Sequence, residues 1–387
     1  MRFSDGLRRG AIILARMRLG INGWRLCGQR TGVARYLFNV LRHWTPEMTS
    51  RFSRITLYTP RPIDRHQIPL PASIDEQVLA SDWPMLVWEN LRFGPASRDD
   101  VLFCPSFSRP LLARGRSVVA THDAVYHVRP DMFPLSVRLF YRRLYDWSDR
   151  HATLIITDAE AVKRDIVNFC GVPAGKIRVT YLAPAECFGL VKDRAELDRV
   201  RRQYVGSDTP FFLFVGKMSG RRSLPHLLDA FAQFKRRTRS EHRLLLVGLN
   251  PNQLDVRGLT RELNIEADVK SSGYVDDEEL NRLYNAALSF VMPSVYETSS
   301  LPVMEAQATG LPVICIENPG MTEITGNAAL RIPRLESSLL CDAMVRLAED
   351  ASLRGELSAQ GLRNAARFSW RRCSADTLAV LEEAALQ

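Results

Sequence analysis

The sequence has no hydrophobic run approaching the ~20 apolar residues needed to cross a bilayer, which excludes an integral membrane protein. Its first apolar run, Ala11–Ala15, is followed at once by Arg16 and is too short for a signal-peptide core, so we expect a cytoplasmic protein. The seven cysteines form no Cys-x-x-Cys pair and no cluster with histidine, so we predict buried free thiols and no zinc site. Without a Gly-x-Gly-x-x-Gly motif, ordinary NAD binding has little support.

The remaining composition is that of a globular protein. The chain has 387 residues, of which 46% are hydrophobic and 25% charged, and this length suggests about two domains. The balance of basic over acidic residues is +10 in residues 1–190 and −1 in residues 191–387. This asymmetry indicates an amino-terminal half that faces an anionic partner, although a solubilising surface would give the same asymmetry.

Short apolar runs alternate with helical patterns along the chain. The first series of predicted strands covers residues 17–21, 55–59, 100–104, 117–122 and 152–157, and the second covers 211–216, 242–248, 287–293 and 311–317. Apolar strands that alternate with helices predict an α/β protein with two doubly wound parallel sheets. We therefore expect an extension over 1–16 with the structural start at Met17, domains over 17–190 and 191–368, and a carboxyl-terminal helix over 369–387.

Such sheets bind ligands at the carboxyl ends of their strands, and residues 287–310 carry acids at that position. Glu297 precedes a predicted helix and Glu305 lies about one turn inside it. Glu305 could accept two ribose hydroxyls, and Glu297 could reach a sugar ring. A diphosphate could bind the backbone N–H groups at the helix start, which belong to Thr298, Ser299, Ser300 and Leu301. Alternatively, the two acids only complement the helix dipole.

Three further strand ends or helix starts carry candidate binding groups. Lys217 and Arg222 follow a predicted strand and match a diphosphate, although a solvated basic loop has the same composition. His122 ends another strand, where it could touch substrate, whereas a lone histidine is more often structural. Gly32, after Arg30 and Thr31, would let the backbone approach a ligand at a helix start.

The order and spacing of these segments resemble the retaining glycosyltransferases of family 4, which have the GT-B fold of two Rossmann-like domains facing across a cleft. The chain differs from the family pattern at Thr298-Ser299-Ser300, where the family has Gly-Phe-Gly, and at Arg222, where it has Lys. The matching elements are Thr31-Gly32 with Arg35-Tyr36, the pair His122–Asp123, Gly216-Lys217 with Arg222, and Pro293-Ser294 with Glu297, Glu305 and Ala306.

The resemblance implies a metal-independent retaining hexosyltransferase without a cofactor. Its donor would be a nucleotide-diphosphate sugar, with a GDP-hexose such as GDP-mannose favoured over a UDP-sugar, and its acceptor a lipid-linked or growing polysaccharide. His122 and Glu297 would be catalytic, and Gly32, Lys217, Arg222 and Glu305 would bind substrate. No Asp-x-Asp occurs, which agrees with a metal-free site.

Two alternatives come from other classes of protein. A sugar-nucleotide epimerase shares the fold but needs its own acid and base carboxylates. A non-enzymatic basic binding protein, such as a nucleic-acid binder, would explain the basic half and leave Glu297 and Glu305 unused, so we expect no nucleic-acid partner.

A basic and aromatic stretch suggests peripheral attachment to the inner face of the cell membrane. An anionic membrane surface would suit such a composition. An amphipathic core helix with its arginines outside is the alternative. The stretch contains Arg138, Arg142, Arg143 and Arg150 around Phe140, Tyr141, Tyr145 and Trp147.

Overall fold

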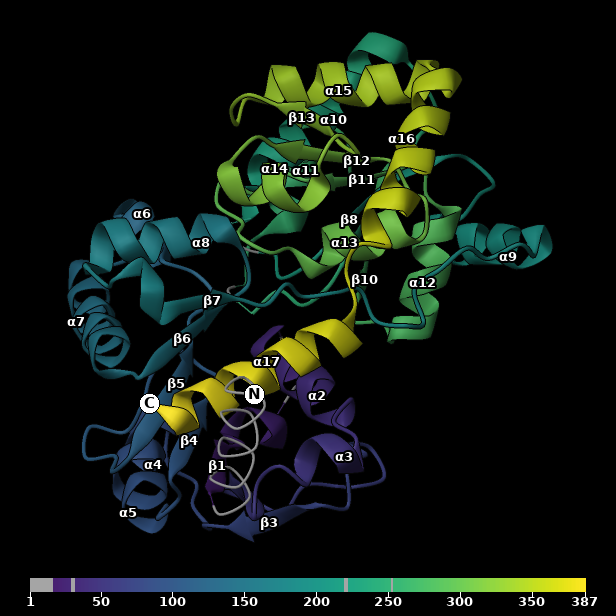
Figure 1. The fold of residues 1–387 in the computed structure, drawn as a ribbon. Coiled ribbons are helices and arrows are strands. Elements are labelled where there is room, and N and C mark those ends of the chain that lie inside the picture. The colour runs from purple at the N-terminus through teal and green to yellow at the C-terminus, as the bar shows by residue number, and fades with distance from the viewer. Residues whose placement is uncertain (1–16, 29–31, 219–221, 252) are drawn as a thin grey trace, which may run out of the picture. The chain divides into compact units, whose positions relative to one another are not determined.

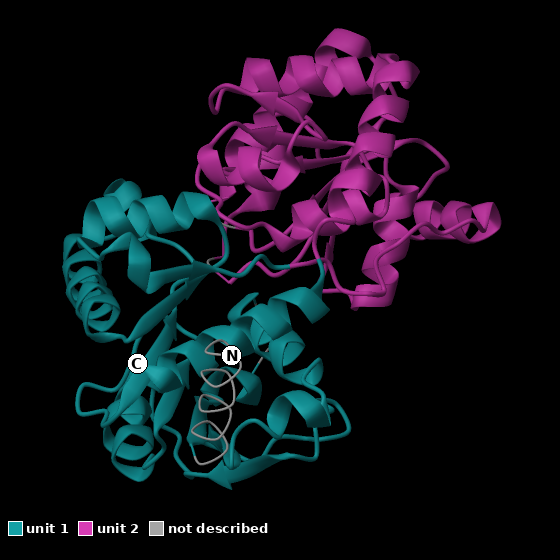
Figure 2. Ribbon diagram, viewed as in Figure 1, with its two compact units in different colours: residues 1–182, 369–387 teal, residues 183–368 magenta. Residues whose placement is uncertain are grey.

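The computed structural model describes residues 17–28, 32–218, 222–251 and 253–387, and the chain forms two compact units (Figure 2). The amino-terminal unit comprises Met1–Leu182 and Ser369–Gln387, and the carboxyl-terminal unit comprises Ala183–Phe368. The predicted boundary lay after residue 190, and the last helix was predicted to be separate from both domains. The predicted extension over 1–16 lies outside the described residues.

The amino-terminal unit contains a seven-stranded sheet in which every strand pair is parallel. The four residues of β4 and the four of β6 are all buried, as expected for central strands covered by helices on both faces. In spatial order the strands are β3 (Ile74–Val78), β2 (Arg54–Thr59), β1 (Arg18–Asn22), β4 (Val101–Cys104), β5 (Arg116–Ala120), β6 (Leu154–Thr157) and β7 (Ile177–Val179).

The carboxyl-terminal unit contains a six-stranded sheet that is also parallel throughout. Phenylalanines from β8 and the following helix fill its core, with the rings of Phe212 and Phe234 5.2 Å apart in an edge-to-face arrangement. In spatial order the strands are β10 (Val269–Gly273), β9 (Arg243–Val247), β8 (Phe211–Val215), β11 (Ser289–Met292), β12 (Val313–Ile316) and β13 (Leu330–Ile332).

Helices connect the strands in both units (Figure 1). The amino-terminal unit contains α2 (Gly32–Arg42), α3 (Pro46–Thr49), α4 (Met85–Trp88), α5 (Gly94–Ala96), α6 (Val125–Val128), α7 (Leu135–His151), α8 (Glu160–Asp165) and α17 (Trp370–Leu386). The carboxyl-terminal unit contains α9 (Arg194–Val205), α10 (Leu224–Thr238), α11 (Val256–Glu262), α12 (Asp277–Ala286), α13 (Leu301–Ala308), α14 (Pro319–Thr325), α15 (Ser337–Glu349) and α16 (Ala351–Ala365).

The last helix, α17, returns to the amino-terminal unit and packs against α2 and the central strands β4, β5 and β6. Ser374 Oγ donates a hydrogen bond to the Val40 carbonyl at 2.6 Å, and Trp44 Nε1 donates to the Ser374 carbonyl at 3.3 Å. The helix predicted over 369–387 is therefore an integral part of the first core.

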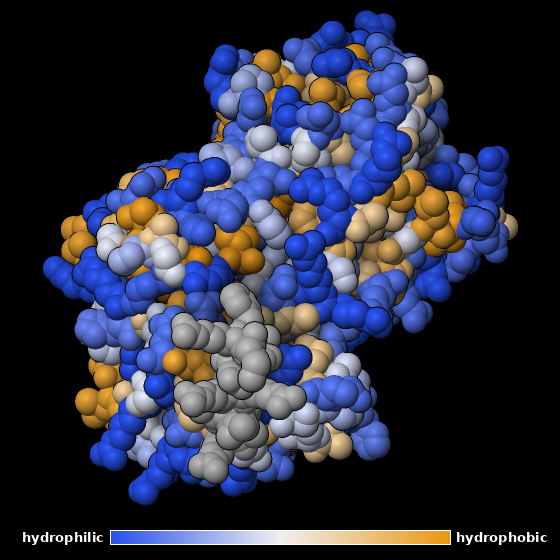
Figure 3. All heavy atoms as spheres, viewed as in Figure 1, coloured by the Kyte–Doolittle hydropathy of each residue, from blue (hydrophilic) through white to orange (hydrophobic). Residues whose placement is uncertain are grey.

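None of the described helices is both long and apolar enough to cross a membrane. On the face shown in Figure 3, hydrophilic residues dominate and hydrophobic residues occur in scattered groups. Five of the seven cysteines are buried, as predicted, whereas Cys187 is exposed and Cys27 is half-buried.

Candidate active site

The loop that follows β11 carries the acidic pair predicted from the sequence. Strand β11 lies inside the sheet, between β8 and β12, and α13 starts directly after Ser300. Pro302 lies in the first turn of α13, and Gly310 has a φ of +70° just beyond its end. The predicted sequence of strand, loop and helix is therefore confirmed, and it places Glu297 in the loop and Glu305 inside the helix.

Glu297 is paired with a basic residue from the neighbouring strand end. Arg222 Nη1 lies 2.6 Å from Glu297 Oε1, and it also lies 3.1 Å from Met292 Sδ at the end of β11. The Glu297 side chain is only 10% exposed, so solvent screens this ion pair weakly. Two residues that the sequence analysis treated as separate site elements therefore contact each other.

Two serine hydroxyls in the same loop are buried without a hydrogen-bonding partner among the described residues. These are the Oγ atoms of Ser299 and Ser300, and the Ser300 residue is only 2% exposed. Ser300 occupies the N-cap position of α13, yet its side chain does not cap the helix. Because buried hydroxyls usually find a partner, this pair marks a place where a bound molecule could supply acceptors.

Glu305 is the most deeply buried of the predicted site residues. It is 1% exposed, and Tyr284 on α12 donates its hydroxyl to Glu305 Oε2 at 3.2 Å. Tyr284 is itself fully buried. The helix therefore places Glu305 about one turn from Leu301, as predicted, whereas no sequence pattern pointed to its tyrosine partner.

Two glycines let the ends of β8 and β9 approach each other. A Cβ on Gly248 would collide with the Gly216 carbonyl group, whose carbon would lie 2.8 Å away, and Gly248 has a φ of +135°. Lys217 follows Gly216 and is exposed to solvent. A Cβ on Gly216 would lie 3.9 Å from Arg222 Cζ, so the strand end passes close to the guanidinium.

A glycine that the sequence analysis did not assign packs under the Glu297 loop. Gly320 lies in α14, and a Cβ there would collide with the Glu297 carbonyl oxygen and lie 2.7 Å from Thr298 Cα. The sequence signal for this position is the Pro319-Gly320 dipeptide after β12. This close approach fixes the path of the loop that carries Glu297.

In the amino-terminal unit, His122 follows β5 and is held by the ends of both neighbouring strands. Its Nδ1 lies 2.9 Å from Asp158 Oδ2, and its Nε2 lies 3.0 Å from the Pro105 carbonyl oxygen. Burial alone would lower the pKa of His122, but the Asp158 carboxylate and the Pro105 carbonyl raise it above its ordinary value. Asp123, which the sequence analysis paired with His122, accepts a hydrogen bond from the Val125 N–H.

Gly32 is the first residue of α2 and is exposed, with no atom within 4 Å of where its Cβ would lie. The adjoining Arg30 and Thr31 lie outside the described residues. Gly32 is therefore helical, and no role of Gly32 in binding follows from its contacts.

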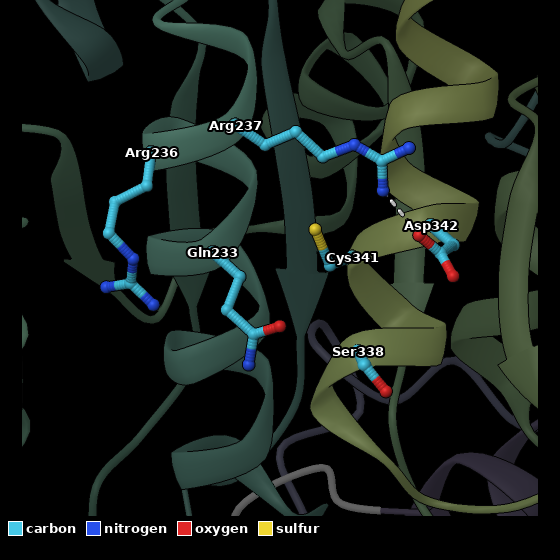
Figure 4. A pocket seen from close by; sticks show the side chains of 6 residues that line it. All are labelled: Gln233, Arg236, Arg237, Ser338, Cys341 and Asp342. Carbon is cyan, nitrogen blue, oxygen red and sulfur yellow. Dashed lines mark hydrogen bonds and ion pairs between the residues drawn. The ribbon is translucent and has the colours of Figure 1, made fainter.

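A surface groove between α10 and α15 lies outside this set of residues (Figure 4). Arg237 and Asp342 form an ion pair across it at 2.5 Å. None of the sequence-predicted site residues lines the groove, whose walls are Gln233, Arg236 and Arg237 on α10 and Ser338, Cys341 and Asp342 on α15.

The two parallel sheets define a protein with the GT-B fold, and known structures share this fold. Anabaena Alr3699/HepE in complex with UDP-glucose superposes with a TM-score of 0.73 over 94% of this chain and 98% of that chain, at 17% identity. Sucrose-phosphate synthase from Thermosynechococcus elongatus gives a TM-score of 0.74 over 94% and 97%, at 18% identity. The predicted fold class is confirmed.

Sequence comparisons identify the family. Residues 198–363 match the family described as "Glycosyl transferases group 1". The O-antigen chain mannosyltransferase B of Escherichia coli is 30% identical over 283 residues, which are 73% of this chain and 74% of that protein. The chain therefore belongs to the group 1 glycosyltransferases, and the prediction that it is a transferase enzyme is confirmed.

Replacing Gly320 with alanine should impair catalysis, because the new methyl group would push the Glu297 loop out of place. Overpacking of this kind costs about 1–3 kcal/mol of folding stability, and relief of the clash would displace the loop. A displacement that raises the activation free energy by ~1.4 kcal/mol lowers the rate tenfold, so we expect transferase activity to fall by about tenfold or more. Gly355→Ala in α16 is the matched control, since its Cβ would meet no atom within 4 Å. Equal activity of the two variants would show that the loop does not depend on Gly320.

Replacing Asp158 with asparagine should lower the pKa of His122, and NMR titration of the imidazole ring can measure this. Because the folded pKa of His122 is raised, its pairing stabilises the chain fully below the unfolded pKa of ~6.5. The contribution disappears as the pH rises through the folded pKa, so the stability advantage of wild type over Asp158→Asn should shrink with rising pH. Asp131→Asn, at an exposed carboxylate paired with Arg129, is the control. An unchanged His122 pKa in Asp158→Asn would contradict this assignment.

Proposed function

We propose that this glycosyltransferase transfers a hexose from a nucleotide-diphosphate sugar with retention of configuration and without a metal ion. The carboxyl-terminal unit would bind the donor, and the basic amino-terminal unit would bind the acceptor. The observation that carries the donor site is the loop after β11, where two buried hydroxyls without described partners adjoin the start of α13 and the Arg222–Glu297 pair.

Phosphate oxygens fit the polar groups of this loop. The start of a helix attracts anions through its N–H groups and its dipole. The hydroxyls of Ser299 and Ser300 would donate to phosphate or sugar oxygens, a capacity that the family's phenylalanine and glycine at these two positions lack. The replacement of the family's Gly-Phe-Gly by Thr298-Ser299-Ser300 therefore supports hydrogen bonding between this loop and the donor. Leu301, which is buried, would contribute its backbone N–H.

The chemical step would be stabilised by the nearby cations. Departure of the nucleotide diphosphate develops negative charge, and Lys217 and Arg222 would stabilise that charge together with the start of α13. Arg222 carries five N–H donors, so its contact with Glu297 leaves donors for a phosphate. Glu297 would hold Arg222 in place before the donor binds and orient the sugar once it is bound.

The remaining predicted residues would have distinct roles. Glu305 would accept the ribose hydroxyls, with Tyr284 fixing the carboxylate in the orientation that accepts them. His122 would contact the transferring sugar, and Asp158 would keep its ring oriented. Gly32 would allow the backbone at the start of α2 to approach a ligand.

We propose mannose as the sugar, GDP as the nucleotide and a lipid-linked or growing polysaccharide as the acceptor. The Escherichia coli relative is named as an O-antigen chain mannosyltransferase, which supports both the mannose and the polysaccharide. A UDP-sugar is the second candidate, because the structurally similar Anabaena protein was solved with UDP-glucose. Release of free GDP or UDP from the matching sugar nucleotides, in the presence of acceptor, separates the two. Family membership does not favour the epimerase or the non-enzymatic binding protein.

We also propose that α7 attaches the chain to the anionic inner face of the cell membrane. Only Ser148 and Asp149 of this helix are fully buried. Leu135 and Phe140 are 59% and 56% exposed, and Arg143 is also exposed. Exposed apolar side chains beside arginines favour contact with a membrane. They disfavour the alternative, in which α7 is a core helix with only its arginines exposed.

Substitutions of Glu305 and Glu297 should change different kinetic constants. Glu305→Gln should mainly raise the KM for the donor, because ribose contacts stabilise ground state and transition state alike. Glu297→Gln should mainly lower kcat, by about tenfold for each ~1.4 kcal/mol lost, because it frees Arg222 and weakens contact with the sugar. Glu266→Gln, at an exposed carboxylate paired with Arg257, is the control and should change neither constant. Wild-type kinetics in both variants, or the reverse pattern, would contradict the proposed donor site.

Binding to vesicles that contain anionic lipid should weaken as salt rises, since exposed charges are screened beyond ~8 Å at physiological ionic strength. Co-sedimentation can measure this, and Phe140→Ser combined with Arg143→Gln should weaken binding. Tyr274→Ala, at a 70% exposed aromatic residue of the carboxyl-terminal unit, is the control. Equal binding to neutral and anionic vesicles would contradict the electrostatic attachment.

A further inference from the structure

Three side chains of the kinds that bind transition metals meet in the amino-terminal unit, and the proposed transferase function uses none of them. They are His127 on α6, Asp146 on α7 and Cys170 at the end of the π-helical segment η4 (Ile166–Cys170). One ligand atom from each residue lies within 4.8 Å of the other two. Among the described residues, no other group of three or more histidine, cysteine or acidic side chains meets in this way. No zinc site was predicted from the sequence, because these residues lie far apart in the chain and only the fold brings them together.

The contacts of His127 converge on a single ring nitrogen. Its Nε2 lies 2.7 Å from Asp146 Oδ1 and 3.8 Å from Cys170 Sγ. One proton on Nε2 can point well to only one of these groups. In a nucleophilic triad the histidine would instead contact the thiol through one nitrogen and the carboxylate through the other. Imidazole nitrogen, carboxylate oxygen and thiol sulfur instead face one another at one place, as ligands around an ion do.

The geometry points to a zinc ion bound by His127 Nε2, an Asp146 carboxylate oxygen and Cys170 Sγ, with a fourth position left for water. Zinc favours imidazole, thiolate and carboxylate ligands in tetrahedral geometry, whereas magnesium and calcium favour oxygen alone. Bonds of ~2.0–2.3 Å hold tetrahedral ligand atoms about 3.3–3.8 Å apart. The histidine–cysteine separation already fits, and the histidine–aspartate contact would open by about 0.6 Å on binding.

Burial and charge are compatible with this ion. The His127 and Asp146 side chains are 6% and 16% exposed, and Cys170 is 4% exposed. Burial raises the pKa of Cys170 in the metal-free chain, so zinc would displace the thiol proton to solvent and bind the thiolate. Thiolate and carboxylate together would balance the two positive charges. Arg150, whose Nη2 lies 3.8 Å from Asp146 Oδ2, leaves the other carboxylate oxygen to the metal.

The ion would link three segments of the amino-terminal unit. It would tie α6 and α7 to the end of η4, where Phe169 stacks on the His127 ring at 5.9 Å. The expected effect is higher stability of this part of the amino-terminal unit when zinc is bound.

Titration of the untagged, metal-stripped full chain with Co²⁺ tests this directly, because a cobalt–thiolate bond gives a charge-transfer absorption band. We expect one equivalent of Co²⁺ to produce the band and zinc to abolish it by displacement. Cys170→Ser should remove the band, and His127→Gln should weaken zinc binding by more than about tenfold. Cys187→Ser, at the exposed cysteine of the other unit, should behave as wild type.

Thermal unfolding provides the second readout. Zinc should raise the melting temperature of wild type and Cys187→Ser, and leave that of Cys170→Ser unchanged. If Cys170→Ser does not fold, the cobalt spectrum of the wild-type chain is the test of the zinc site. A wild-type chain without the thiolate band, or equal zinc affinity in wild type and His127→Gln, would overturn the zinc site. Transferase activity is not a readout, so failure here would leave the proposed donor site untouched.

Discussion

Parallel pairing of buried strands is the constraint on which the rest of this structure depends. Because every strand pair in both sheets is parallel, the carboxyl ends of the strands in each sheet lie along one edge. Strands covered on both faces are almost wholly apolar, so polar groups become available where the strands end. Arg222 and Glu297 follow the adjacent strands β8 and β11 and can therefore pair. Pro105, His122 and Asp158 follow β4, β5 and β6 in the same way.

The same constraint explains which parts of the fold the sequence predicts. All nine predicted strands occur in the structure, and the four that were missed, β3, β7, β10 and β13, lie at the edges of the two sheets. An edge strand needs no apolar pattern on both faces. In β3 only Ile74 is buried, and β10 reads Val-Lys-Ser-Ser-Gly with no fully buried residue. The architecture was therefore predictable, whereas the width of each sheet was not.

For the candidate site, the sequence predicted which residues lie at strand ends better than it predicted which residues contact one another. Their positions at strand ends singled out His122, Arg222 and Glu297. Position along the chain could not reveal that Tyr284 contacts Glu305, or that Gly320 packs under the loop, because these contacts join separate helices and loops. Asp158 follows its strand just as His122 does, so the strand-end rule could have identified it. Sequence spacing could not predict the contacts of Cys170, because the three residues involved lie on separate segments.

In the proposed function, the loop after β11 and the start of α13 hold a nucleotide diphosphate. Hydrogen–deuterium exchange of the full chain, with and without saturating GDP or UDP, tests this most directly. We expect slower exchange in peptides covering residues 293–305, and in those around Arg222, for at least one of the two nucleotides. Protection confined to other segments, or none with either nucleotide at saturation, would contradict it.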